Sequence, residues 1–169
     1  MKPPQIVRLC ALFTGLAAAT KLDKRQDDGL TVTVDLSANR GPPPHHGAAF
    51  IYGIPDTLNQ IPDNFYTDIG FNYARAGGAQ LAAGGWVGGP DEYQVRFEST
   101  RSNYITARKY NAPFILLPHD VWGTDSVNSS TAWPGDNGDW SDYDAFLEKL
   151  SDDLAANDML DGLIWDIWK

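Results

Sequence analysis

Four short apolar runs alternate with segments of helical spacing, and this alternation restricts the fold more than any other feature of the chain. The runs cover residues 48–53, 71–75, 113–119 and 162–168. Between them, helical stretches cover residues 62–69, 91–110 and 141–154. Strands and helices that alternate in this way are joined by crossovers, which make neighbouring strands parallel. The order therefore predicts an α/β fold with a parallel sheet.

Residues that begin and end helices support these segments. Pro62 fits the first turn of the first helix, and Gly70 marks its end. Ser141 and Asp144 have the spacing of a capping pair at the start of the last helix. We therefore expect helix boundaries close to these positions.

The position of the loops separates two ways of building such a sheet. The two longest loops, 77–90 and 120–140, both follow predicted strands, so they lie at the carboxyl end of the sheet, where barrel enzymes place their sites. No glycine fingerprint follows the first strand, which argues against a dinucleotide-binding sheet. We predict the N-terminal half of a (β/α)8 TIM barrel, about four βα units with parallel strands. A small doubly wound sheet is the alternative, and strand order distinguishes the two.

The first residues predict secretion. Lys2 and Arg8 supply positive charge, residues 9–16 are apolar and residues 17–19 are small, a pattern typical of a cleaved signal peptide over residues 1–19. The apolar run is too short to span a bilayer, and no later stretch reaches the roughly 20 apolar residues that a spanning helix needs. We expect a secreted, extracellular protein without a membrane anchor.

Residues 20–46 are predicted to form a propeptide or leading strand and a Pro-rich connector, followed by one partial barrel domain over 47–169. Lys24-Arg25 is either a processing site or a pair of charges in a frayed terminus. The sole cysteine, Cys10, lies in the signal peptide, so no disulfide is expected. Asn128 opens an Asn-Ser-Ser triplet, an acceptor for N-glycosylation that is consistent with secretion.

The charge balance restricts the ligand. The formal net charge is −9 and the sequence contains no basic cluster, which argues against nucleic acid and anionic membranes as partners. A neutral substrate suits such a surface. His45 and His46 are adjacent but lack further ligands at metal-binding spacing, so neither a metal nor another cofactor is expected.

Several polar and aromatic side chains follow the predicted second and third strands. Arg75 ends the second strand, where it either serves a site or forms an ordinary salt bridge. His119 and Asp120 end the third strand at the loop face, where they either bind sugar hydroxyls or cap the loop. Trp122 is a candidate platform for a sugar ring, with packing of the loop as the alternative.

The last apolar run combines two tryptophans with one carboxylate. Both of its faces are apolar except for Asp166, a pattern typical of a strand covered on both sides. Trp165 and Trp168 beside Asp166 predict either a sugar-stacking wall or core packing. The run is too short for a helix.

Three segments together resemble a known family. They are Arg75, the sequence Leu117-Pro118-His119-Asp120-Val121-Trp122-Gly123 and the sequence Leu163-Ile164-Trp165-Asp166-Ile167-Trp168. Over roughly residues 47–168, the chain resembles secreted fungal-type glycoside hydrolases of clan A, most like family 39, which contains xylosidases and related exo-acting enzymes. The resemblance implies a TIM barrel that hydrolyses O-glycosidic bonds in plant or fungal polysaccharides or oligosaccharides with retention, and a carbohydrate as its substrate.

The resemblance also assigns roles to residues. It implies that Arg75 keeps the nucleophile carboxylate ionised, that an Asn-Glu-Pro motif after the fourth strand supplies the acid/base Glu, and that a Glu on the seventh strand is the nucleophile. Lys169 stands where that Asn is expected, so we expect a chain truncated before the motif, inactive because it lacks both Glu residues.

Two further expectations follow for such a partial barrel. The alternative function is a noncatalytic carbohydrate-binding protein that uses Trp122, Trp165 and Trp168. The open edges of the partial sheet also predict self-association.

Overall fold

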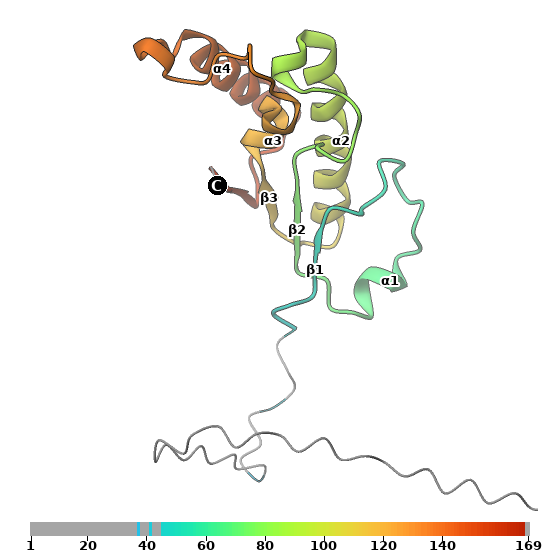
Figure 1. Cartoon of the computed structure of the whole chain (residues 1–169). Coiled ribbons are helices and arrows are strands. Elements are labelled where there is room, and N and C mark those ends of the chain that lie inside the picture. Colours follow the sequence, from blue (N-terminus) through green and yellow to red (C-terminus); the bar gives the residue numbers. More distant parts are fainter. Residues whose placement is uncertain (1–36, 38–40, 42–44, 168–169) are drawn as a thin grey trace, which may run out of the picture. The chain divides into compact units, whose positions relative to one another are not determined.

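The computed structural model describes residues 37, 41 and 45–167 (Figure 1). The chain divides into two units, Met1–Gly41 and Pro42–Lys169, and the fold described below belongs to the second. The predicted signal peptide at 1–19 lies outside the described residues. So do Trp168 and most of the predicted segment 20–46.

A four-stranded parallel sheet forms the centre of this unit, in the order β1-β2-β3-β4. The strands are β1 (Ala49–Ile51), β2 (Tyr73–Ala76), β3 (Phe114–Leu116) and β4 (Leu163–Trp165). They lie within or next to the four apolar runs, so the predicted α/β fold with parallel strands is confirmed. Each strand is shorter than its run.

Helices lie between the successive strands, as the alternation predicts. They are α1 (Asn64–Thr67), α2 (Pro90–Lys109), α3 (Pro118–Trp122) and α4 (Ser141–Ala156), with short 3-10 turns at η1 (Trp86–Gly88), η2 (Thr124–Ser126) and η3 (Asp136–Gly138). The prediction for α2 is correct to within one residue at each end, because Pro90 occupies its first turn. The prediction for α1 is too long, since only one turn forms.

The boundary after β3 differs from the prediction. The strand ends at Leu116, and Pro118 begins helix α3, because proline fits the first turn of a helix but cannot donate to a strand ladder. Gly123 ends the helix with a φ of 101°, a conformation that favours glycine. His119 and Asp120 therefore lie on α3 rather than at the end of a strand.

The predicted capping pair of Ser141 and Asp144 is wrong. Ser141 is the first residue of α4, and its side chain makes no capping bond. Instead Asp139 accepts hydrogen bonds from the Ser141 backbone N–H at 3.0 Å and from its hydroxyl at 2.7 Å. The acceptor at the start of α4 is therefore Asp139, two residues before Ser141, because Ser141 already lies within the helix.

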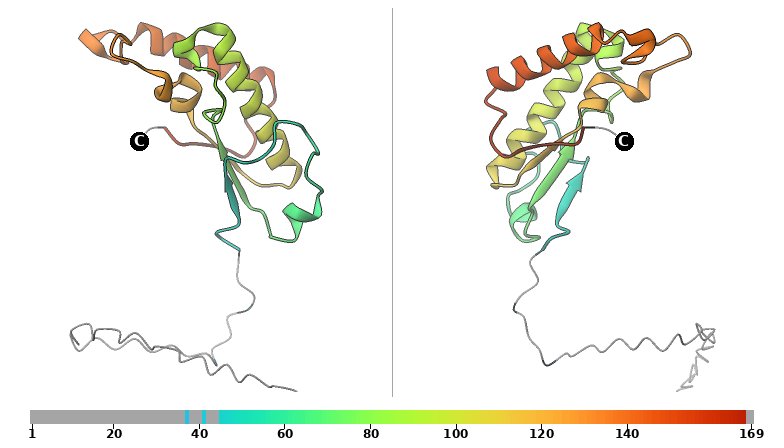
Figure 2. Two further views of the ribbon diagram at one scale, coloured as in Figure 1. Left: turned by 45° about the vertical axis from the view of Figure 1, so that its right-hand side comes forward. Right: turned by 90° about the vertical axis from the view of Figure 1, so that its left-hand side faces the viewer.

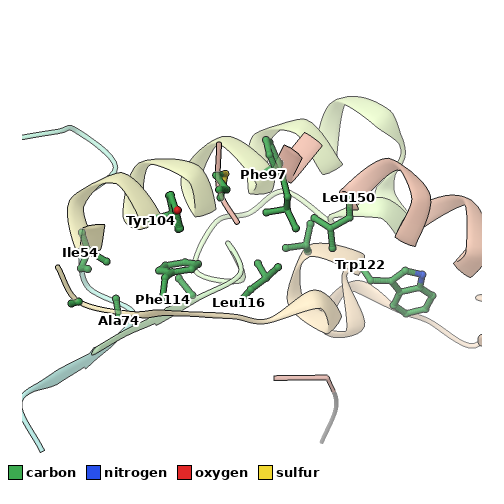
Figure 3. Packing of buried hydrophobic residues seen from close by; sticks show 14 of the residues in the cluster. Ile54, Ala74, Phe97, Tyr104, Phe114, Leu116, Trp122 and Leu150 are labelled. Atoms are coloured by element: carbon green, nitrogen blue, oxygen red, sulfur yellow. The ribbon is translucent and has the colours of Figure 1, made fainter. Parts of the chain in front are cut away.

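The core lies on one face of the sheet. Ala74, Ala76, Phe114 and Leu116 of the central strands are buried, and the rings of Phe114 and Tyr104 of α2 meet edge to face at 5.8 Å. Figure 3 shows Phe97 of α2 and Leu150 of α4 close to these strand residues. Helices α2 and α4 therefore cover the same face of the sheet.

The opposite face of the sheet is open in the part of the chain that the structure describes. Ile51, Arg75, Ile115 and Ile164 share this face, because they form one row of strand partners. Ile51 is 67% exposed and Ile164 is 41% exposed. The left view of Figure 2 shows α1 and α2 together on the other side. The prediction that the last strand is covered on both sides is therefore wrong for β4.

The strand order also bears on the doubly wound alternative. A doubly wound sheet has helices on both faces and a point where the strand order reverses. The described sheet runs from β1 to β4 without a reversal, and the two long helices, α2 and α4, cover one face. The order therefore fits a singly wound sheet.

Candidate functional site

An ion pair joins the carboxyl ends of β2 and β4. The Nη2 and Nε atoms of Arg75 donate to Oδ2 of Asp166 at 2.7 Å and 3.1 Å. The side chains are 19% and 25% exposed, so the pair is partly shielded from water but open to a ligand. The backbone N–H of Asp166 donates to the carbonyl of Leu116 at 2.9 Å, which fixes Asp166 beside β3.

A second polar group lies at the same end of the sheet. The Tyr52 hydroxyl donates to Oδ2 of Asp120, and Nε2 of His119 lies 3.3 Å from Oδ1 of the same carboxylate. The backbone N–H of Tyr52 donates to the carbonyl of Arg75 at 3.1 Å, which ties the residue after β1 to β2. Side chains from β2, the end of β1, α3 and the end of β4 thus gather at the carboxyl end.

Tyr52 has two unusual properties. Its φ is 62°, a left-handed conformation that is rare for a bulky residue and that occurs often at functional sites. Burial, followed by the hydrogen bond to Asp120, raises the pKa of the Tyr52 hydroxyl well above its usual value. The hydroxyl therefore remains a protonated donor at neutral pH.

A glycine allows α3 to approach the end of β2. A Cβ atom on Gly77 would lie 2.6 Å from Cβ of Asp120 and 2.7 Å from the carbonyl oxygen of Leu117. Only a residue without a side chain permits this approach. Gly77 therefore helps to place Asp120 beside Tyr52.

Buried Arg96 holds together the two long loops predicted to form the site. Its Nε donates to the carbonyl of Ala83 at 2.6 Å, and its Nη1 donates to the carbonyl of Asp120. Both terminal nitrogens bind the Asp125 carboxylate, at 2.7 Å and 2.9 Å. These bonds hold the pKa of the Asp125 carboxyl below its usual value. Arg96 thus fixes the backbone that carries Asp120.

The predicted tryptophans do not form a wall beside the ion pair. Trp122 is 1% exposed, and its ring packs against Trp133 at 5.7 Å and Tyr143 at 6.4 Å. The prediction of a sugar platform at Trp122 is therefore wrong, and loop packing explains its position. Trp165 is 44% exposed, but its partner in the sheet is Leu116, so it lies on the face opposite Arg75.

The catalytic carboxylates implied by the family resemblance have no counterpart among the described residues. Glu92 and Glu98 lie on α2, and Glu148 lies on α4. Glu92 accepts a hydrogen bond from the backbone of Gly84 at 2.6 Å, so it supports the glycine-rich loop. Asp120 and Asp166 are carboxylates at the carboxyl end of the sheet.

Other site predictions concern metals, membranes and glycosylation. Among the described residues, no three His, Cys, Asp or Glu side chains are placed to hold a metal ion. In the same part of the chain, no helix is both long enough and apolar enough to cross a membrane. Asn128 lies exposed in the loop before η3, where its Oδ1 accepts the N–H of Ser130 at 2.8 Å.

Sequence reasoning identified Arg75, Asp120 and Asp166 but missed Tyr52 and Arg96. Tyr52 follows β1 directly and precedes Gly53, so the same rule that selected Arg75 could have selected it. Arg96 lies in the middle of a long helix, and its spacing does not indicate that it is buried. Comparisons of the chain with protein-family models, curated proteins and solved structures found no match.

Proposed function

We propose that this chain provides the sugar-binding side of a secreted retaining glycoside hydrolase with a (β/α)8 barrel. The observation that carries the proposal is the Arg75–Asp166 ion pair at the carboxyl end of the sheet. Barrel enzymes place their sites at this end. The resemblance of Arg75, the segment 117–123 and the segment 163–168 to such hydrolases supports the same function.

The chemistry of the site suits a neutral ligand with several hydroxyl groups. Arg75 and Tyr52 supply donors, whereas Asp120 and Asp166 supply acceptors. A sugar hydroxyl both donates and accepts, so it can bind between such groups. The formal net charge of −9 disfavours an anionic ligand.

The barrel is part of the proposal. Its support is the strand order without reversal, together with the long helices α2 and α4 on one face of the sheet. The row of Ile51, Ile115 and Ile164 on the open face has the apolar character of a barrel interior, which is filled by branched side chains.

The described residues bind and position the sugar rather than cleave it. Retaining hydrolysis needs two carboxyl groups about 5 Å apart, one as acid/base and one as nucleophile. Arg75 engages Asp166 through two donors, and Tyr52 and His119 contact Asp120, so both carboxylates act as positioned acceptors. We therefore propose that these residues bind carbohydrate without turnover. This property is shared with the alternative function, a noncatalytic carbohydrate-binding protein.

Calorimetric titration of the full chain with xylose, glucose and xylobiose tests the proposal. Asp166→Asn should weaken binding about tenfold, because a hydrogen bond to a charged group contributes roughly 1.5–3 kcal/mol. Asp161→Asn is the matched control, since it breaks the Arg108–Asp161 pair before β4, at the amino end of the strand. Equal affinity for the two variants would contradict the proposal. Release of nitrophenol from aryl glycosides by the chain would contradict its lack of turnover.

A further inference from the structure

The loop before α4 forms an aromatic hollow near the end of β4. Trp133, Pro134, Trp140, Tyr143 and Ile167 line this hollow, which has a volume of about 360 Å³. Trp133 is 40% exposed and Trp140 is 53% exposed. Large aromatic faces that gather at a surface hollow are typical of ligand-binding sites.

The loop holds these rings in place through its own hydrogen bonds. The backbone N–H of Trp133 donates to Oδ2 of Asp136 at 2.9 Å, and the N–H of Asp136 donates to the carbonyl of Trp133 at 3.0 Å. Gly135 closes the turn by donating to the carbonyl of Asp139 at 2.9 Å. Because the backbone is fixed in this way, little conformational entropy is lost when a ligand binds.

Gly135 also fixes the Trp140 ring. A Cβ atom on Gly135 would lie 2.5 Å from Cζ2 of Trp140, and its φ of 85° favours glycine. The indole therefore lies directly against the glycine backbone. The Trp140 ring also meets the Tyr143 ring of α4 in an edge-to-face arrangement, with ring centroids 6.4 Å apart.

A second hollow of about 220 Å³, lined by both aromatic and acidic side chains, shares Trp133, Pro134 and Tyr143 with the aromatic hollow. Its other lining residues include the carboxylates Asp136, Asp139 and Asp142. Hydrogen bonds from Ser141 hold the pKa of the Asp139 carboxyl below its usual value, so it stays ionised and accepts hydrogen bonds. An aromatic face bordered by acceptors suits a pyranose ring and repels an anion.

Trp122 provides a further polar atom beside this second hollow. Trp122 lines the hollow, and its buried Nε1–H has no acceptor among the described residues. Buried indole N–H groups usually have an acceptor. This Nε1 atom is shielded from solvent, so it lies behind the wall of the hollow and does not contact a bound sugar.

The chain connects the aromatic hollow to the Arg75–Asp166 pair. Ile167, which lines the hollow, directly follows Asp166. Consecutive Cα atoms lie about 3.8 Å apart, so the backbone at the edge of the hollow adjoins the backbone of Asp166. Contact with both places requires a ligand longer than one sugar.

We infer that Trp133 and Trp140 form a second sugar subsite, which binds the neighbouring unit of a neutral oligosaccharide held at Arg75 and Asp166. This inference rests on the proposed function. It assigns the two tryptophans to recognition of chain length, whereas the ion pair recognises the first sugar.

Calorimetric titration of the full chain with xylose and xylotetraose tests the subsite. The tetrasaccharide should bind the unmodified chain about five- to tenfold more tightly than xylose. Trp140→Ala should remove this gain and leave xylose binding unchanged, and Trp140→Phe should restore part of it. Phe65→Ala, which removes a similarly exposed ring on α1, is the control and should retain the full gain. Circular dichroism checks that each variant is folded.

The outcomes separate the subsite from the proposed function. If Asp166→Asn weakens binding of both sugars, and Trp140→Ala keeps the tighter binding of the tetrasaccharide, the proposed function stands and the subsite is overturned. If Trp140→Ala removes tetrasaccharide binding and Asp166→Asn has no effect, the aromatic site stands and the role of the ion pair is overturned. If neither sugar binds the unmodified chain, both are overturned.

Discussion

Tyr52 shows how a single residue connects backbone conformation to the chemistry of the site. Its left-handed φ of 62° accompanies a backbone bond to β2 and a side-chain bond to Asp120 on α3. An unfavourable backbone conformation persists only where surrounding contacts hold it. We therefore assign Tyr52 to positioning Asp120.

Tyr52→Phe removes one hydroxyl and keeps the ring. The free energy of unfolding should fall by about 1–2 kcal/mol, because the buried Asp120 loses a hydrogen-bond donor. Urea denaturation followed by circular dichroism measures the change. Tyr73→Phe on β2 is the control, with an expected change within about 0.5 kcal/mol because its side chain is exposed. A Tyr52→Phe value as small as that of the control would contradict this role.

Gly77→Ala tests the close approach between the end of β2 and α3. The added Cβ would meet Asp120 and the Leu117 carbonyl at less than 3 Å, so the free energy of unfolding should fall by about 1–3 kcal/mol. Gly47→Ala is a matched control, because a Cβ at that position meets no atom within 4 Å. Thermal denaturation of both variants provides the comparison. Equal thermal midpoints for Gly77→Ala and Gly47→Ala would contradict the prediction, because they would mean that α3 shifts without a loss of stability.

At the scale of elements, the sequence predicted the helices and strands better than it predicted the boundaries between them. Helix α2 was predicted closely because Pro90 marks its start and the helical spacing continues for five turns. The end of β3 was missed, because the apolar residues 114–117 continue into Pro118 and hydropathy alone cannot separate a strand end from a helical turn.

Sequence patterns predicted some residues of the site but not how those residues meet. Arg75 and Asp166 follow or end strands, so the parallel arrangement placed them at one end of the sheet. Their direct pairing depends on the order of the strands, which local sequence patterns do not reveal. The burial of Trp122 likewise depends on Trp133 and Tyr143, which pack against it from the following loop and α4.

Arg96→Met tests whether α2 anchors the two long loops. The substitution keeps most of the buried apolar volume but removes donors from the carbonyls of Ala83 and Asp120. The free energy of unfolding should fall by about 2–4 kcal/mol, as expected when one partner of a shielded polar network is lost. Arg101→Met is the control, because its pair with Glu98 is exposed and contributes about 1 kcal/mol or less. Chemical denaturation measures both variants. An equal free energy of unfolding for Arg96→Met and Arg101→Met would contradict the anchoring role.

At the scale of the whole molecule, the open face of the sheet determines how the chain behaves in solution. Ile51, Ile164 and Ile167 are exposed at or near the edge strands β1 and β4. Exposed apolar surface beside unpaired strand edges promotes association. We therefore expect the chain of 169 residues to form oligomers.

Size-exclusion chromatography with light scattering tests this expectation. The average mass should rise with protein concentration, and Ile164→Lys should lower it by placing a charge on the open face. Leu160→Lys is the control, because Leu160 is exposed but lies before β4. A monomer at every concentration would contradict self-association through this face.

The most direct test of the central claim is a 1H–15N NMR titration of the full chain with xylobiose, observing the Nε–H signal of Arg75. The account predicts a saturable shift of this signal, and Asp166→Asn should reduce the apparent affinity about tenfold. The indole signal of Trp140 should shift in the same titration. An Arg75 signal that stays unchanged while other signals move would place the sugar elsewhere and contradict a binding site at the Arg75–Asp166 pair.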